Sequence, residues 1–519
     1  MGTRNLNRRD FGRLAAGAAA LWASCRVARA AAKPDRPNIL FIMADDHTTQ
    51  ALGVYGSRLA KLNPTPALDG LAKAGMRFDR VYCNNSICTP SRASIITGQY
   101  PQTNGVLDLT GWIAPEKQYL PKEMNKAGYQ TAMVGKWHLK LEPAAFDYYC
   151  VLPGQGKYYS PDFRVRGNRP WPRNTIRKAG QHSSDAITDI SLEWLKNGRD
   201  KSKPFFLMHH FKAPHDMFQN AKRYESYLAD VDVPEPTNLH NQPGKGFGSK
   251  ATRDYGAGVT KAHPSWGLAR KLGVDGTLEE PKHGQVAYQR YLKRYLRCVK
   301  GVDDNVKRLV DYLRSTGELD NTVILYTGDQ GFFLGEHDFM DKRWMYEEAF
   351  RMPFIVHWPK GVKAGSVNDW LINNTDFAPT MLELAGVAET PSYMQGRSFA
   401  AALAGKPKPK DWRKVTYYRY WMHMAHSLRV PAHFGIRSDR YKLIFFYGCD
   451  PRGRNQTPVA WEFYDLAKDP QEMNNAYGDP AYKSVIAQMK KQLKATREQL
   501  NETDRNYSAI QKIIDAHWD

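Results

Sequence analysis

Cysteines and long apolar segments are both scarce in this chain of 519 residues, which holds only six cysteines. No apolar run reaches the roughly 20 residues that a transmembrane helix needs, so the sequence indicates no membrane span. Cys25 lies near the N-terminus, and Cys88 lies in a motif described below. Four cysteines remain, and they either form one of three disulfide pairings or stay as free buried thiols: Cys83, Cys150, Cys298 and Cys449.

Acidic residues are also few. The chain carries 53 Asp and Glu against 74 Lys and Arg, which gives a formal charge of +21. Residues 1–30 contain six Arg and one Asp, or +5, which leaves +16 on the rest of the chain. Such a surface favours nucleic acid, an acidic membrane or an acidic glycan as partner, although solubility alone also explains it. We find no nucleic-acid-binding motif, so we expect no nucleic-acid partner.

The first 30 residues have the pattern of an export signal. They contain a stretch like a twin-arginine motif, an apolar stretch and a small-x-small cleavage site: Asn7-Arg8-Arg9-Asp10-Phe11-Gly12-Arg13-Leu14, Leu14 to Ala23 and Ala28-Arg29-Ala30. Lipid attachment at Cys25 is the alternative, but Trp22 fits poorly three residues before it. We therefore expect the twin-arginine translocase as a maturation partner and a periplasmic or secreted protein.

Two apolar runs that lie far apart in the chain each end in carboxylates. Residues 37–44 lead into Asp45 and Asp46, and residues 322–328 lead into Asp329 and Gln330. Such runs are typical of strands buried in a parallel sheet, whose carboxyl ends flank the ligand crevice. If the strands are neighbours, these side chains converge, and repulsion among three carboxylates calls for a cation. An all-oxygen donor set favours Ca²⁺ over Mg²⁺ and argues against Zn²⁺; two solvated Asp-rich turns are the alternative.

Residues 88–98 form the most specific motif, Cys-Thr-Pro-Ser-Arg-Ala-Ser-Ile-Ile-Thr-Gly. As local structure it predicts a short helix with Thr89 as N-cap, Pro90 as first residue and Gly98 as C-terminal stop. The free N–H groups of such a helix start would face an incoming anion. The run resembles the signature of the type I sulfatases of the alkaline phosphatase superfamily. In that family a formylglycine-generating enzyme oxidises the cysteine to an aldehyde, and the resemblance implies this modification for Cys88.

The resemblance also implies a mechanism and a metal. The hydrated aldehyde carries two hydroxyls: one attacks sulfur, and loss of a proton from the other later expels sulfate. A serine in the same place has only one hydroxyl, so after attack on sulfur it would stay sulfated. One Ca²⁺ lies beside Cys88 in the family, which implies Asp45, Asp46, Asp329 and Gln330 as further ligands. The family more often has Asn or His where this chain has Gln330, but Gln also offers a carbonyl oxygen.

Basic residues and histidines in four further places match family landmarks. They are Arg92 of the first motif, Gly135-Lys136-Trp137-His138-Leu139, Pro214-His215 at the end of a strand-like run, and Lys342 just before Met345-Tyr346-Glu347. By resemblance Lys136 contacts sulfate, Lys342 bridges sulfate and the leaving oxygen, His138 serves the diol and His215 is the leaving-group acid. Arg92 pairs with the aldehyde hydrate or a metal carboxylate.

Out of context these side chains are equally consistent with ordinary roles. Lys136 and His138 would be surface residues, and Arg92 would form a structural ion pair. Three histidines are interpreted as structural, with two packed in a strand and one bracing a loop: His209, His210 and His337. Lys212 is within reach of the pocket but is not assigned to it.

The predicted fold class is α/β, with a large mixed, mostly parallel sheet flanked by helices and a small C-terminal α+β subdomain that carries an antiparallel sheet. We expect a signal peptide at 1–30, a catalytic domain at 35–386 with a family-specific insert at 217–285, and the subdomain at 387–519. A long helix is predicted over 286–314. In the subdomain we predict one strand over 433–447, a partner at 461–466 and one helix over 480–500.

The function that this pattern favours is hydrolysis of sulfate esters on a sulfated polysaccharide or oligosaccharide. Residues 146–149 and 152–156, together with the C-terminal part, resemble bacterial relatives of the glucosamine-6-sulfatases; 2-sulfated uronates and galactan sulfates are alternatives. A phosphodiesterase or phosphonate hydrolase that uses the same modified cysteine is a second interpretation, which the export signal disfavours. The third is a glycan-binding protein without catalysis.

Overall fold

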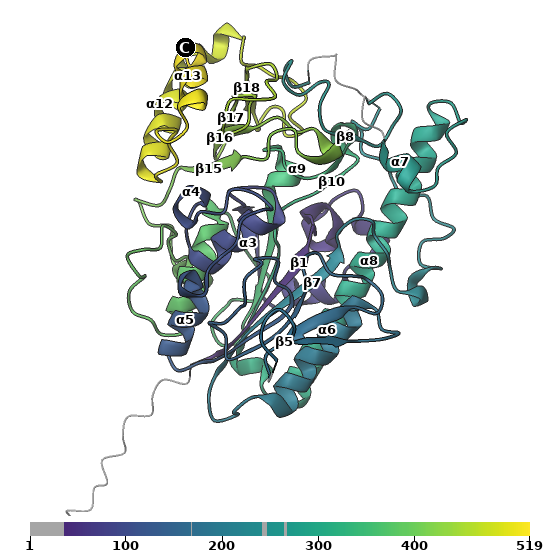
Figure 1. Cartoon of the computed structure of the whole chain (residues 1–519), viewed down its shortest axis with the longest axis vertical. Coiled ribbons are helices and arrows are strands. Elements are labelled where there is room, and N and C mark those ends of the chain that lie inside the picture. The colour runs from purple at the N-terminus through teal and green to yellow at the C-terminus, as the bar shows by residue number, and fades with distance from the viewer. Residues whose placement is uncertain (1–35, 168, 241–246, 264–266) are drawn as a thin grey trace, which may run out of the picture. The chain divides into compact units, whose positions relative to one another are not determined.

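The two apolar runs that end in carboxylates form neighbouring parallel strands, as expected (Figure 1). The computed structural model describes residues 36–519 except 168, 241–246 and 264–266, so the expected signal peptide at 1–30 lies outside the described residues. Residues 37–519 form one compact unit. In this described part, no helix has the length and apolar character needed to cross a membrane.

A sheet of eleven strands, counted over the described residues, forms the centre of this unit. Its strands are β1 (Asn38–Asp45), β2 (Met76–Tyr82), β3 (Gln130–Lys136), β4 (Tyr148–Leu152), β5 (Asp162–Val165), β6 (Thr175–Arg177), β7 (Phe205–Pro214), β9 (Thr322–Gly328), β12 (Arg351–His357), β13 (Ser366–Asn368) and β14 (Ile372–Asn373). The order is β13-β2-β12-β9-β1-β7-β3-β4-β5-β6, and β14 also pairs with β2.

The central strands β9, β1, β7, β3 and β4 are parallel, whereas β12, β5 and β6 pair antiparallel with their neighbours. The sheet is therefore mixed and mostly parallel, which confirms the predicted fold class. The close contact of β3 and β7 requires a glycine. A Cβ on Gly135, whose φ is +101°, would lie 1.9 Å from the carbonyl oxygen of His210.

Helices cover both faces of this sheet (Figure 1). The helices of the described residues are α2 (Pro66–Lys73), α3 (Cys88–Thr97), α4 (Pro101–Asn104), α5 (Tyr119–Lys126), α6 (Ser183–Glu193), α7 (Gly267–Lys271), α8 (Lys282–Ser315), α9 (Glu347–Phe350), α10 (Phe377–Leu384), α11 (Ala400–Leu403), α12 (Lys483–Gln499) and α13 (Ser508–His517). Of these, α12 and α13 pack against the C-terminal part and not against this sheet. The predicted long helix is α8, which starts four residues earlier than expected, directly after Pro281.

Strand β1 shows why two helical layers are needed. Its side chains alternate between two separate cores, so both faces of the strand are apolar. Ile39 and Phe41 join the core that contains residues of α3, α5 and α10. Leu40 and Ile42 join the core that contains residues of α2, α6 and α8.

A small antiparallel sheet follows in the C-terminal part, as predicted, with the order β15 (Val415–Tyr420), β16 (His433–Ser438), β17 (Tyr441–Phe446) and β18 (Ala460–Asp465). The predicted single strand over 433–447 is wrong, because Asp439 and Arg440 turn the chain and β16 pairs with β17. No glycine marks this turn, and strand-forming residues flank it on both sides. The predicted helix is α12, but a second helix, α13, and strand β15 were missed.

A third sheet combines β8 (Ala257–Gly258), β10 (Phe333–Leu334) and β11 (Phe339–Asp341). It pairs the segment 217–285 with the loop that carries Lys342. The five described cysteines are all free and buried. The sequence left disulfide pairing or free buried thiols as alternatives, and the structure has free thiols at Cys83, Cys150, Cys298 and Cys449.

Candidate active site

The parallel strands place four predicted site residues at one edge of the sheet. Asp45 and Lys136 are the last residues of β1 and β3, His215 directly follows β7, and Asp329 directly follows β9. The four strands are consecutive neighbours in the order β9-β1-β7-β3. Their carboxyl ends therefore meet, as ligand crevices in α/β sheets require.

Helix α3 delivers Cys88 to this edge. The helix begins at Cys88 with Ile87 as N-cap, so the predictions of Thr89 as N-cap and Pro90 as first residue are wrong by two positions. The Thr89 hydroxyl contacts His138 instead, at 3.4 Å from Nδ1 and 3.2 Å from the carbonyl oxygen. Gly98 ends the helix as predicted, with a φ of +66° that suits glycine. Every residue of α3 is buried, which fixes the position of Cys88.

The carboxylates converge in the structure. Ligand oxygens of Asp45, Asp46 and Asp329 all lie within 4.8 Å of one another, and all three side chains are buried. The backbone N–H of Asp46 donates to Oδ1 of Asp329 at 3.0 Å. Burial raises the pKa of Asp46 and of Asp329, and the neighbouring carboxylates add to both shifts. The three acids therefore repel one another, although the neighbouring cations outweigh burial at Asp45 and hold the pKa of that carboxyl well below its usual range.

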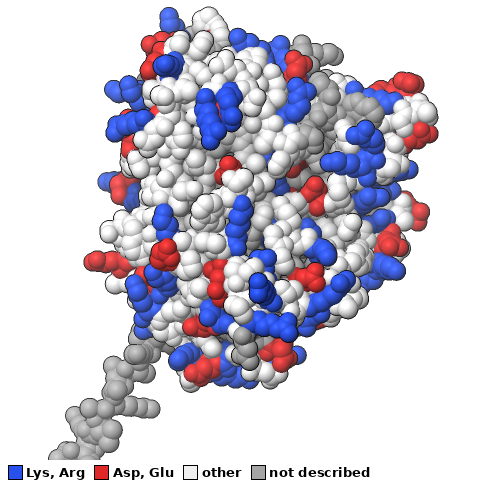
Figure 2. Space-filling model, in the orientation of Figure 1, with Lys and Arg blue, Asp and Glu red and all other residues white. Residues whose placement is uncertain are grey.

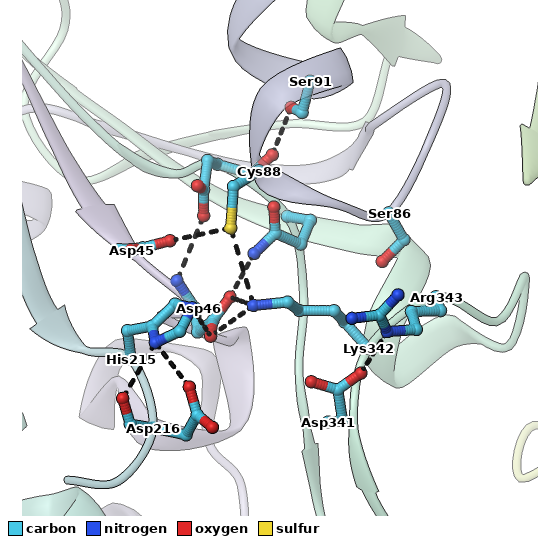
Figure 3. A network of polar contacts seen from close by, with 12 residues as sticks. Asp45, Asp46, Ser86, Cys88, Ser91, His215, Asp216, Asp341, Lys342 and Arg343 are labelled. Atoms are coloured by element: carbon cyan, nitrogen blue, oxygen red, sulfur yellow. Dashed lines mark hydrogen bonds and ion pairs between the residues drawn. The ribbon is translucent and has the colours of Figure 1, made fainter. Parts of the chain in front are cut away.

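Three cations face the three acids. Arg92 bridges Asp329 at 2.9 Å and Asp45 at 3.7 Å. Lys136 forms an ion pair with Asp45, and its Nζ lies 3.8 Å from the sulfur of Cys88. Lys342 donates to both oxygens of Asp46, at 2.5 and 2.6 Å, and lies 3.6 Å from the same sulfur (Figure 3). The two lysines thus flank Cys88 from different strands and loops.

The Cys88 thiol is protonated in this environment. It is buried, and its sulfur donates to Oδ1 of Asp45 at 3.2 Å. Burial raises the pKa of Cys88 well above its usual range, and Asp45 adds to the shift, which Lys136 and Lys342 only partly oppose. Because the thiolate is the nucleophilic form, the unmodified side chain is a poor nucleophile at neutral pH.

The two predicted catalytic histidines occupy different positions. His215 is buried, donates from Nδ1 to the carboxylate of Asp216 at 2.6 Å, and places Nε2 3.9 Å from Asp46 (Figure 3). Burial lowers its pKa, with Lys136 and Lys342 adding to this effect and Asp216 opposing it. Burial and the cations Lys136 and Arg92 lower the pKa of His138 to about 2, so His138 is a neutral imidazole.

The three histidines interpreted as structural, and Lys212, lie around the site rather than in it. His209 and His210 are buried in β7, as expected, and Nδ1 of His210 lies 3.2 Å from the Lys136 carbonyl oxygen. His337 is buried and stacks on Phe247 at 4.3 Å, which agrees with a bracing role in its loop. Lys212 lies over the ring of Tyr158 at 4.7 Å.

Sequence reasoning missed several residues around the cluster. Gln155 lies in the Leu-Pro-Gly-Gln-Gly stretch, which suggested a relative but no role, and it accepts from Lys136 at 2.5 Å. Asp216 orients His215, although an acid in a Pro-His turn gives no distinct signal. Asp341 and Arg343 pair at 2.8 Å on either side of Lys342 (Figure 3). The sequence offered one signal for these two residues, because both adjoin Lys342, which matches a family landmark.

A cavity of about 400 Å³ opens onto Cys88, His215 and Lys342. Much of the remaining wall comes from three parts of the chain. They are Ala257, Gly267, Leu268, Arg270 and Lys271 of the segment 217–285, Asp341 and Arg343 of the Lys342 loop, and His426 and Leu428 of the C-terminal part. The volume suits one sugar unit rather than a long chain.

The residues present fit a hard divalent cation. All donors of the Asp45, Asp46 and Asp329 cluster are oxygens. The buried Oε1 of Gln330 has no hydrogen-bond partner among the described residues, while its Nε2 donates to Asp46. An unpartnered buried carbonyl oxygen beside three mutually repelling carboxylates is what a Ca²⁺ site offers. A second candidate group, formed by Asp45, Cys88 and His215, shares one carboxylate with the first.

The chain matches known proteins over most of its length. The family model Sulfatase covers residues 37–387, and the model N-sulphoglucosamine sulphohydrolase, C-terminal, covers residues 335–499. An N-acetylglucosamine-6-O-sulfatase of Bacteroides thetaiotaomicron is 40% identical over 90% of this chain and 88% of its own length. The N-acetylglucosamine-6-sulfatase of Capra hircus is 30% identical over 76% of this chain and 68% of its own length.

Solved structures agree with these sequence matches. A protein in complex with its substrate D-glucosamine-2-N,6-O-disulfate is 38% identical, with a TM-score of 0.81 over 90% of this chain and 99% of that one. A putative sulfatase of Bacteroides fragilis, 22% identical with a TM-score of 0.70 over 92% and 98%, shares the fold. The fold is therefore alkaline phosphatase-like, as the resemblance implied, and the chain belongs to the sulfatase family and is a sulfuric ester hydrolase.

Proposed function

We propose that the protein removes the 6-O-sulfate from glucosamine units of a sulfated glycan. The observation that carries this proposal is the likeness, at 38–40% identity over 90% of the chain, to an N-acetylglucosamine-6-O-sulfatase and to a protein bound to a 6-O-sulfated glucosamine. The cavity of about 400 Å³ in front of Cys88 has room for one such sugar. The phosphonate monoester hydrolase among the solved neighbours is 22% identical and supports the fold alone.

In this proposal Cys88 is converted to formylglycine, whose hydrate supplies two hydroxyls on one carbon. A thiol with a raised pKa that donates to Asp45 cannot play this part, which favours conversion. Asp45, Asp46, Asp329 and Gln330, with the modified residue 88, would hold Ca²⁺. When bound, the ion neutralises the acids and withdraws charge from a sulfate oxygen.

The cations then bind and polarise the sulfate. Lys136 and Lys342 reach the Cys88 side chain from opposite elements, so an attacking atom at position 88 has an ammonium on each side. Arg92 holds Asp45 and Asp329 in place through its guanidinium group. Fixed charges of this kind stabilise a transition state because they need no reorganisation during the reaction.

The two histidines divide the proton transfers. His138 is neutral and takes the proton from the second hydroxyl of the hydrate, which releases sulfate. In this proposal His215 protonates the sugar oxygen that leaves; Asp216, 2.6 Å from Nδ1, raises the pKa of the imidazole against the lowering by burial, Lys136 and Lys342. Asp216 therefore acts as a positioning residue for His215.

Replacing His215 by alanine should lower the activity to a different degree on substrates with different leaving groups. A sugar alkoxide needs a proton on departure, whereas an activated phenolate does not. We expect kcat/KM on a sugar sulfate to fall by about 10²–10⁴-fold and kcat/KM on a nitrophenyl sulfate to fall by far less. Asp216→Asn should give the same selectivity with a smaller loss. Equal losses on both substrates would contradict this role of His215.

A panel of sulfated sugars tests the substrate assignment. Protein produced together with a formylglycine-generating enzyme should release sulfate from N-acetylglucosamine 6-sulfate faster than from 2-sulfated uronates or galactan sulfates. Ion chromatography of free sulfate measures each rate. Cleavage of a 2-sulfated uronate or a galactan sulfate with an inert N-acetylglucosamine 6-sulfate would refute the sugar assignment but not the family.

The proposal extends to the boundaries of the domains and to the cellular location of the protein. We propose a catalytic domain over 35–386, an insert over 217–285 that shapes the substrate side, and a C-terminal subdomain over 387–519. The insert supplies Arg270 and Lys271 to the cavity wall, which supports its place at the substrate. We also propose export to the periplasm or beyond through the leader at residues 1–30.

A further inference from the structure

The N-terminal half of helix α8 carries cations that have no carboxylate partner. Five of them line a hollow of about 940 Å³ beside the helix: Lys282, Arg290, Lys293, Arg294 and Arg297. None of the five lies within 4.0 Å of a carboxylate of the described residues. Only two acids line the same hollow, Asp232 and Glu235, and Glu235 contacts His240 at 3.0 Å. The hollow therefore carries a clear excess of positive charge.

The C-terminal half of the same helix is arranged differently. There the cations pair with carboxylates, either on the helix or across to α6: Lys300 with Asp304, Lys307 and Arg314 with Asp311, and Arg308 with Asp189. Pairing at i,i+3 and i,i+4 is how a solvated helix face usually balances its charge. The unpaired first half is thus a local feature and not a general property of this surface.

The cations without a carboxylate partner lie close enough along the helix to repel one another. Arg290, Lys293, Arg294 and Arg297 lie three or four positions apart, which puts neighbours on one face of the helix. At Arg297 burial lowers the pKa, and Glu225 opposes this lowering more strongly than Arg294 adds to it. From Lys282 to Arg297 the stripe spans about 22 Å at 1.5 Å per residue. A polyanion of similar length would relieve this repulsion along the whole stripe.

The stripe is connected to the catalytic cavity through α7. Arg270 and Lys271 at the end of α7 line the cavity in front of Cys88, and the next residue, Leu272, lines the α8 hollow. Arg290 ties the two together by donating to the carbonyl oxygens of Leu272, at 3.4 Å, and of Gly273. Figure 2 shows Lys and Arg gathered on the side where Figure 1 places α7 and α8.

We propose that the groove along the N-terminal half of α8 is an exosite for a sulfated glycan chain. A stretch of the chain that does not react would lie along Lys282, Lys293 and Arg294 and their neighbours, while the reacting unit enters the cavity across α7. Guanidinium and ammonium groups bind sulfate and carboxylate through charge-assisted hydrogen bonds. The proposal rests on the proposed function, because it assumes that the substrate is a glycan with several anionic groups.

The test compares two triple variants that each lose three positive charges. The exosite variant is Lys282→Gln, Lys293→Gln and Arg294→Gln. The control is Lys483→Gln, Lys491→Gln and Lys494→Gln, three exposed positions on α12. Sulfate release from heparin and from N-acetylglucosamine 6-sulfate is measured at low and high ionic strength. Elution from immobilised heparin gives a second readout that does not depend on catalysis.

We expect the exosite variant to lose about tenfold in kcat/KM on heparin at low ionic strength, because electrostatic steering contributes tenfold or more. Its activity on the monosaccharide should stay within about twofold, and the loss on heparin should shrink at high salt. It should also elute from heparin at lower salt than the control.

Equal behaviour of the two variants on the polymer and on the column would overturn the exosite. A wild-type protein that cleaves no sulfated sugar would refute the proposed function instead, and the column alone would then decide whether α8 binds the polymer.

Discussion

Replacing Cys88 by alanine will abolish turnover of every sulfate ester while the protein stays folded. The proposed nucleophile is built on this side chain, and no other thiol among the described cysteines lines the cavity. We expect kcat to fall by about 10⁶-fold, the loss seen when a catalytic nucleophile is removed. Cys88→Ser should be informative as well, because a single hydroxyl can accept sulfate but cannot expel it. It should therefore show at most one turnover.

Cys150→Ala is the matched control for this experiment. Cys150 is also a free buried thiol, but it lies in strand β4, away from the cavity walls. Each substitution shortens one buried side chain, the formylglycine at position 88 or the thiol at position 150, so their effects on the melting temperature should be similar and small. Only Cys88→Ala should lose activity. Retention of substantial activity by Cys88→Ala would refute the assignment of the nucleophile.

Removal of the metal should have the second largest effect. Chelation should inactivate the enzyme, and Ca²⁺ should restore it better than Mg²⁺ does. Asp329→Asn should lower kcat/KM by at least about 100-fold, because loss of a mere hydrogen-bond partner of a metal ligand already costs about 10–100-fold. In the presence of a chelator the stability of this variant reflects two opposing effects, because the substitution removes one of three neighbouring carboxylates and also breaks the buried ion pair with Arg92. Added Ca²⁺ should raise the melting temperature of the wild type but not of this variant.

Asp504→Asn is the control for loss of a buried carboxylate. Asp504 is buried and pairs with Arg419 at 2.6 Å and with Arg497, in the C-terminal part. Breaking such a pair costs about 3–5 kcal/mol, so this variant should be less stable but fully active at low temperature. Its melting temperature should still rise with Ca²⁺. Full activity of metal-stripped wild-type protein would refute the metal site.

The sequence predicted the convergence of the carboxylates on the condition that the two strands are neighbours, and the structure meets this condition. Two long apolar runs gave the strands, and the rule that parallel strands share their carboxyl ends placed Asp45 and Asp329 together. The start of α3 was predicted less well. Thr89 has the side chain of an N-cap, but its hydroxyl contacts His138, a partner that becomes available only through the tertiary fold.

Other parts of the site depend on contacts that no local pattern reveals. Gln155 reaches Lys136 because β4 lies beside β3, and strand order is not encoded in either segment alone. The cavity walls supplied by Arg270 and His426 come from a segment without regular periodicity and from the C-terminal part. The hairpin of β16 and β17 was missed for a local reason, since its turn contains neither Gly nor Asn.

The mass of the peptide that carries Cys88 tests the central claim most directly. Protein made with a formylglycine-generating enzyme should contain a residue in which one oxygen has replaced the sulfur and two hydrogens, and it should react with a hydrazide. Across preparations with different degrees of conversion, the specific sulfatase activity should rise in proportion to the converted fraction. A fully active preparation in which Cys88 is an unmodified thiol would contradict the account.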